Sequence, residues 1–97
     1  MLENFTIGTF SVGDVFKVFY GEGQHVEITL VQVSASKFKI PNLKREPFFL
    51  VFSSNKEIWI ETGCYSMEQE KVGNFEMAIT PTAPLDGKFN YYEAAFS

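Results

Sequence analysis

The sequence has 97 residues, a formal net charge of −4 and a hydrophobic fraction of 45%. Because independent domains usually need about 50 to 200 residues, we expect one domain over residues 1–97, and its acidic balance argues against nucleic acid as a partner. A lone cysteine, Cys64, excludes an intrachain disulfide, and no apolar run approaches the roughly 20 residues of a spanning helix, so we expect a soluble, cytoplasmic protein with no membrane contact.

The first half of the chain predicts a β-hairpin followed by an irregular strand. Residues 15–20 are rich in strand-forming side chains and residues 26–30 alternate strictly, while the glycines between them permit the positive φ of a tight turn. After Leu30 the alternation slips, which predicts a bulge or a strand with two apolar faces. The basic stretch 37–44 contains a proline and predicts a loop with an edge segment.

The middle of the chain contains its most apolar segment. Residues 48–52 have no polar side chain, which predicts a strand covered on both faces at the centre of the core. Residues 53–56 are typical of a turn, and alternation in residues 57–61 predicts a further strand.

The last third predicts a second hairpin and a closing strand. Apolar residues alternate with polar ones over 65–79, with a turn at Val72–Asn74; residues 81–87 predict a long loop, and residues 91–96 alternate again. Sequential short strands joined by turns imply antiparallel neighbours. We therefore expect an all-β fold, an antiparallel barrel or small sandwich of six or seven strands built from hairpins.

Four spaced motifs support a family resemblance: Val12–Phe16, Arg45–Phe52, Thr62–Tyr65 and Tyr92–Phe96. In this order they resemble a family of uncharacterised bacterial all-β proteins of roughly a hundred residues, with Arg-x-Pro-Phe, Gly-x-Tyr and terminal Tyr-Glu-Ala motifs. The resemblance implies a setting beside phage-tail-like collar and fibre proteins, and hence a structural or accessory role. It supplies no catalytic residues.

Candidate catalytic and metal-binding residues are few. His25 and Cys64 are the only unusual base and thiol, and we interpret them as a solvated turn residue and a small packing residue. Asp14 and Asp86 each lie in a glycine-containing turn, and Glu68–Glu70 resembles a solvated hairpin end. We predict no catalytic site, no metal and no cofactor, and therefore no enzyme.

The candidate interface residues are Trp59, Glu57, Glu61 and Arg45. If Ile58 and Ile60 face the core, alternation turns Trp59 outward with both glutamates, where it would anchor an interface; a barrel covered on both faces would bury it instead. Arg45 precedes a buried strand and would either bind a partner or close the strand's entry as a structural contact.

Two functions remain open from the sequence. The first is a non-catalytic structural or interaction module that binds a protein partner or a second copy of itself. The alternative is a small-ligand-binding β-barrel whose Phe, Tyr and Met side chains line a pocket. An enclosed cavity would favour the alternative, and a filled interior would favour the interaction module.

Overall fold

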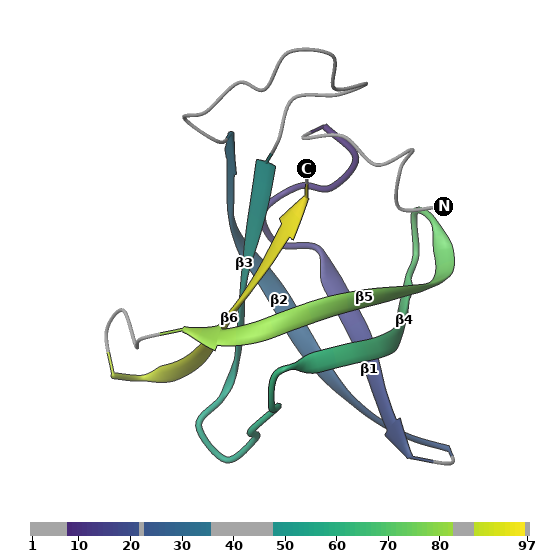
Figure 1. Ribbon diagram of the computed structural model, residues 1–97, viewed down its shortest axis with the longest axis vertical. Helices are drawn as coiled ribbons and strands as arrows, with labels where there is room; N and C mark the ends of the chain where they lie inside the picture. The colour runs from purple at the N-terminus through teal and green to yellow at the C-terminus, as the bar shows by residue number, and fades with distance from the viewer. Residues whose placement is uncertain (1–7, 22, 36–47, 83–86, 97) are drawn as a thin grey trace.

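The computed structural model describes residues 8–21, 23–35, 48–82 and 87–96. Six strands and no helix are present in this part of the chain (Figure 1). The strands are β1 (Val15–Gly21), β2 (Gln24–Ala35), β3 (Phe48–Asn55), β4 (Gly63–Gln69), β5 (Gly73–Thr82) and β6 (Phe89–Phe96).

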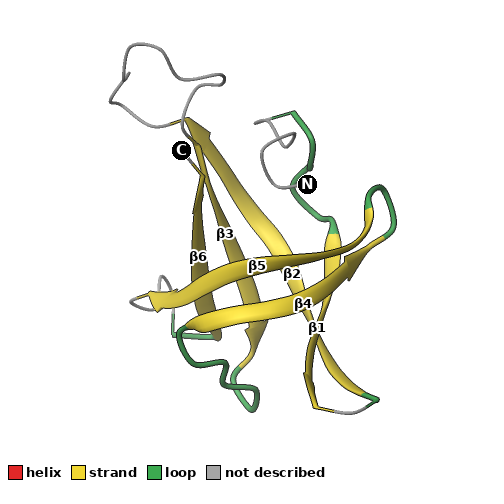
Figure 2. Cartoon of the chain, turned by 45° about the vertical axis from the view of Figure 1, so that its right-hand side comes forward, coloured by secondary structure: helices red, strands yellow, loops and turns green. Residues whose placement is uncertain are grey.

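The six strands form a closed antiparallel barrel in the order β1-β2-β3-β6-β5-β4, and β4 pairs back with β1. The all-β prediction is confirmed, and the closed barrel is selected over the sandwich. Two seams are short: β1 pairs with β4, and β5 with β6, through three residue pairs each. Figures 1 and 2 show the β4–β5 pair crossing the other strands at a steep angle.

Period-two alternation builds the core, because every second side chain of each strand points into the barrel. The predicted central strand is confirmed: Phe48, Leu50 and Phe52 are buried. The Phe16 ring lies 4.9 Å from the ring of Phe52 and 4.9 Å from that of Phe10, measured between centroids. Aromatic side chains therefore fill much of the barrel's interior.

Both predicted hairpins are present. Gly23 (φ 69°) lies in the β1–β2 turn and Gly73 (φ 82°) ends the β4–β5 turn, and both adopt the left-handed backbone that glycine tolerates best. The predicted irregularity after Leu30 is confirmed as a register shift between Leu30 and Gln32 in the pairing of β2 with β3. In β5, Phe75 and its alternate neighbours are buried while the residues between them are exposed.

Three strand boundaries differ from the sequence prediction. Ser53 to Asn55 belong to β3 rather than to a turn, because the buried Ser54 hydroxyl finds a partner 2.9 Å away in the hydroxyl of Tyr92. Residues 57–61 lie in the β3–β4 connection, not in a strand. Pro81 and Thr82 continue β5 instead of opening a loop, since they pair with the closing strand.

Several predictions fall on segments outside the described residues. These are the loop expected over 37–44, the interface residue Arg45, and Asp86. Within the described ranges, no helix has the length and apolar character needed to cross a membrane.

Candidate functional site

The β3–β4 connection, residues 56–62, carries the predicted interface residues and is called here the Trp59 loop. The side chain of Trp59 is 62% exposed, as the alternation predicted for this segment. Glu57 and Glu61 are exposed on either side of it, while Ile60 is buried and Ile58 is half-buried. The two isoleucines anchor the loop to the barrel although it is not a strand.

Trp59 borders a surface groove of about 380 Å³, called here the Trp59 groove. Aliphatic side chains from β1, β2 and the Trp59 loop line it. Its aromatic side chains come from β1, the Trp59 loop and β4, and its two carboxylates come from the loop alone. The lining residues are Val18, Tyr20, Val26, Glu57, Ile58, Trp59, Ile60, Glu61 and Tyr65.

The groove forms where the seam between β1 and β4 ends. The last residue pair of this seam joins Phe19 to Ser66. One further step in the same antiparallel register sets Tyr20 opposite Tyr65, and both rings line the groove. The hydroxyl of Tyr65 donates a hydrogen bond of 2.7 Å to the backbone carbonyl of Glu61, which ties the start of β4 to the Trp59 loop.

The backbone on both sides of Trp59 is held by β6. The hydroxyl of buried Tyr92 accepts a hydrogen bond from the Ile60 N–H at 3.3 Å and lies 3.3 Å from the carbonyl oxygen of Ile58. The side-chain amide of Asn90 donates to the same Ile58 carbonyl at 2.5 Å. The exposed indole is thus carried by a fixed backbone, and its ring centroid lies 6.5 Å from that of Tyr92.

The groove has a one-sided charge distribution. The described residues that line it include two carboxylates, Glu57 and Glu61, and no basic side chain. Neither carboxylate forms an ion pair with a described cation, whereas Glu68 pairs with Lys17 and Asp14 pairs with Lys71. Negative charge therefore lies beside three aromatic rings, and no residue in the described ranges neutralises it.

Two other depressions have similar volumes but different chemistry. One of about 410 Å³ on β5 and β6 is lined by Ala78, Thr80, Pro81, Thr82, Glu93 and Ala95. Another of about 370 Å³ is lined by Phe19, Ser66, Met67, Glu68, Asn74, Phe75 and Glu76. Size does not distinguish the Trp59 groove from these; its exposed indole and two tyrosine rings do.

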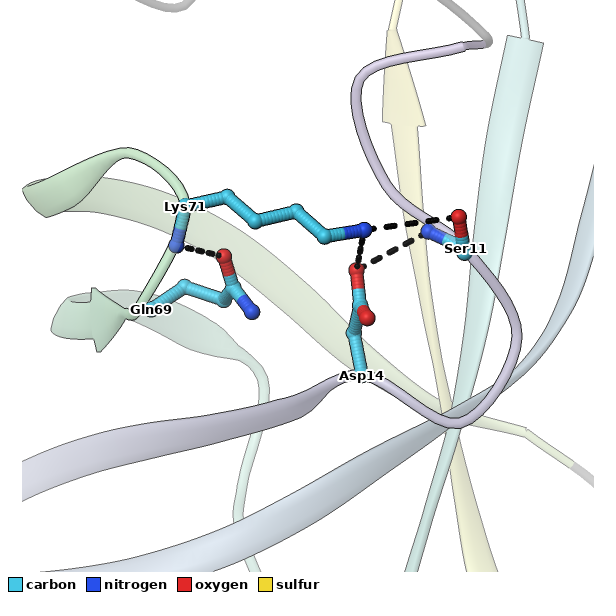
Figure 3. Close-up of polar contacts among 4 residues, drawn as sticks. All are labelled: Ser11, Asp14, Gln69 and Lys71. Atoms are coloured by element: carbon cyan, nitrogen blue, oxygen red, sulfur yellow. Dashed lines mark hydrogen bonds and ion pairs between the residues drawn. The ribbon is translucent and has the colours of Figure 1, made fainter.

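A second polar cluster, called here the Asp14 cluster, joins the turn before β1 to the β4–β5 turn (Figure 3). The Asp14 carboxylate accepts a hydrogen bond from the Ser11 N–H at 2.9 Å and forms an ion pair with Lys71 at 2.9 Å. The Ser11 hydrogen bond is the main cause that lowers the pKa of Asp14 below its ordinary value of 3.8, opposed by burial and reinforced by Lys71. The side-chain carbonyl of Gln69 accepts from the Lys71 N–H at 2.7 Å.

The remaining candidate residues are placed as follows. His25 is exposed beside the β1–β2 turn, as predicted, with its ring 5.6 Å from that of Phe19. Cys64 is exposed on β4, so its interpretation as a packing residue is wrong, because Gly63 and Tyr65 take the inward parity. Gln69 is buried, although a solvated hairpin end was expected. No group of three or more potential metal ligands occurs among the described residues.

Sequence reasoning missed Tyr20 and Tyr65 as groove residues. Tyr20 shares the parity of the buried Phe16 and Val18, which predicts an inward side chain, yet it is 57% exposed. The pairing of β1 with β4 ends at Phe19, one residue before Tyr20. The pairing of β1 with β2 also shifts its register between Phe19 and Gly21. A seam's length depends on pairing between distant strands, so the local sequence held no signal for it.

Fold and site together define a small closed antiparallel barrel. An exposed groove with acidic and aromatic side chains lies where the β1–β4 seam ends. The chain belongs to the family described as domain of unknown function (DUF6916), whose model matches residues 5–96. No curated protein and no solved structure is significantly similar to the chain.

Proposed function

We propose that this domain is a non-catalytic interaction module that binds a protein partner through the Trp59 groove. The observation that carries the proposal is an exposed indole whose flanking backbone is hydrogen-bonded to the barrel. Trp59 is 62% exposed, while the backbone on both sides of it is hydrogen-bonded to Tyr92. Large aromatic side chains are enriched at the energetic centres of protein interfaces, and a fixed backbone lowers the entropy lost on binding.

The groove provides the remaining parts of such an interface. Half-buried Val26 and Ile58 offer apolar contact area around the indole, and two tyrosines add rings with polar tips. The packed aromatic core supports this function over the ligand-binding barrel, because inward rings such as Phe16 and Phe52 contact one another where a ligand would lie. The family resemblance adds the context: an accessory or structural component of a larger, phage-tail-like assembly.

The test compares Trp59→Ala with the parent domain in affinity capture from cells that naturally make it. We expect the parent domain to capture a recurring component of a large assembly, and we expect Trp59→Ala to fail to capture it. A contact at the centre of the interface would contribute about 2 kcal/mol or more to binding. The thermal melt of the variant should change little, because most of the side chain is in solvent.

Val12→Ala is the matched control, because Val12 is 65% exposed in a turn outside the groove and its truncation should leave capture unchanged. A Trp59→Ala variant that melts much earlier yet captures the same component would show that Trp59 serves the fold. Equal capture by all three proteins would contradict the proposed binding surface.

A further inference from the structure

We propose that the Trp59 groove receives a basic side chain, arginine or lysine, of the partner protein. This inference rests on the proposed function and names the chemistry of the partner. It follows from the rings, the charges and the rigidity of the groove, each of which is an independent observation.

The rings supply the first argument. Trp59, Tyr20 and Tyr65 come from three different segments and line one groove of about 380 Å³. Each aromatic face carries a negative quadrupole that attracts a cation, and tryptophan attracts it most strongly. Trp59 and Tyr20 are both more than half exposed, so a ligand can reach them without any displacement of the barrel.

The charges supply the second argument. Glu57 and Glu61 line the same groove, and no described basic residue neutralises them there. Partner surfaces are usually arranged so that opposite potentials meet. An acidic or phosphorylated segment would be repelled, and a purely apolar segment would leave both carboxylates without a counter-charge.

The backbone supplies the third argument. The Tyr65 hydroxyl is bonded to the Glu61 carbonyl, and Tyr92 holds Ile58 and Ile60. These contacts fix the segment between Glu57 and Glu61 before any partner arrives. A site that is already arranged for its ligand loses less conformational entropy when the ligand binds.

The test uses the intrinsic fluorescence of Trp59, the only tryptophan of the chain. The full domain is titrated with blocked pentapeptides of glycine that carry a central arginine, lysine, citrulline or norleucine. Citrulline has nearly the shape of arginine without its charge. We expect saturable binding of the arginine and lysine peptides, with an affinity at least about threefold above that of the citrulline peptide and weaker at high salt.

The double variant Glu57→Gln/Glu61→Gln keeps the shape of the groove and removes its charge. Its preference for the arginine peptide over the citrulline peptide should fall below that of the parent, because only the aromatic rings still attract the cation. The matched control is Glu76→Gln/Glu93→Gln, which removes two exposed carboxylates from outside the groove. This control has the same net charge as the double variant and should retain the parent's preference for arginine.

Several results would overturn the inference. These are equal binding of the arginine and norleucine peptides, no binding of any peptide, and an unchanged preference in Glu57→Gln/Glu61→Gln. Tetramethylammonium that binds as tightly as the arginine peptide would indicate a site for free organic cations instead. Because the peptides are defined, a negative titration combined with Trp59-dependent capture would reject the cation and leave the interaction function intact.

Discussion

The two ends of the barrel are held by different polar contacts: neutral hydrogen bonds at one end and an ion pair at the other. At one end, where Figures 1 and 2 place the Trp59 loop and the β1–β2 turn, the contacts are neutral and centred on the buried Tyr92 hydroxyl. At the other end, the β4–β5 turn is joined to the start of β1 by the charged Asp14 cluster (Figure 3). The first set holds the backbone on both sides of the exposed Trp59, and the second connects two turns.

We expect burial, and not formal charge, to decide how much each contact contributes to stability. A neutral hydrogen bond removed from a buried site leaves donors and acceptors without water. Removing an ion pair that has an exposed partner, such as Lys71, costs little stability, because water replaces the lost contact. We therefore expect the Tyr92 end to be energetically and functionally more sensitive than the Asp14 end.

The largest expected effect is in the core that both ends share. Leu50→Ala should lower the free energy of unfolding by about 2 to 5 kcal/mol, because it leaves a cavity at a fully enclosed site. Denaturant titration measures this value and sets the scale for the two ends. A melt unchanged by this substitution would contradict the barrel's packing.

Tyr92→Phe removes only the hydroxyl that serves the Trp59 loop. We expect a loss of about 1 to 3 kcal/mol of stability, since the Ile60 N–H and the Ser54 hydroxyl lose their shared partner. Partner binding should weaken as well, although Tyr92 is not exposed. Chemical denaturation and capture of the partner measure the two effects. Normal partner binding by a destabilised Tyr92→Phe variant would show that the hydrogen bonds of Tyr92 are not needed for binding.

Asp14→Asn should cost less than about 1 kcal/mol, and the cost should depend on pH. Because the folded state lowers the pKa of Asp14 below 3.8, the charged carboxylate stabilises the protein fully above that value. This contribution is lost as the pH falls through the lowered pKa. Melts of parent and variant should therefore differ near neutrality and converge in acid; a difference that grows in acid would contradict the assignment.

Cys64→Ser is expected to have the smallest effect. The side chain is exposed on β4, so stability should stay within about 0.5 kcal/mol of the parent. Capture of the partner should also persist, because Cys64 does not line the groove, unlike the neighbouring Tyr65. Loss of binding in a normally folded Cys64→Ser protein would extend the site along β4.

Local alternation predicted much of the fold, although residues 57–61 alternate without forming a strand. It predicted the two hairpins, the central strand at 48–52, the irregularity after Leu30 and the outward Trp59. It failed where distant strands decide the outcome. Ser54 was assigned to a turn because its composition is turn-like, whereas its hydroxyl pairs with Tyr92, 38 residues away.

The groove was predictable only in part for the same reason. Trp59, Glu57 and Glu61 stand close together in the sequence, so alternation alone could group them. Tyr20 and Tyr65 join them because the β1–β4 seam stops at Phe19. No local pattern encodes the length of a seam between strands so far apart in the chain.

The position of Tyr92 in β6 also constrains the order of folding. Its hydroxyl reaches the Trp59 loop only after β6, the last of the six described strands, has paired with β3. Contacts between distant segments form late, since loop closure must precede them. During synthesis, a chain that has emerged only as far as β5 therefore carries the indole on a loop that lacks the hydrogen bonds of Tyr92 and keeps only that of Tyr65. Partner recognition would in this way be restricted to chains whose barrel is already complete.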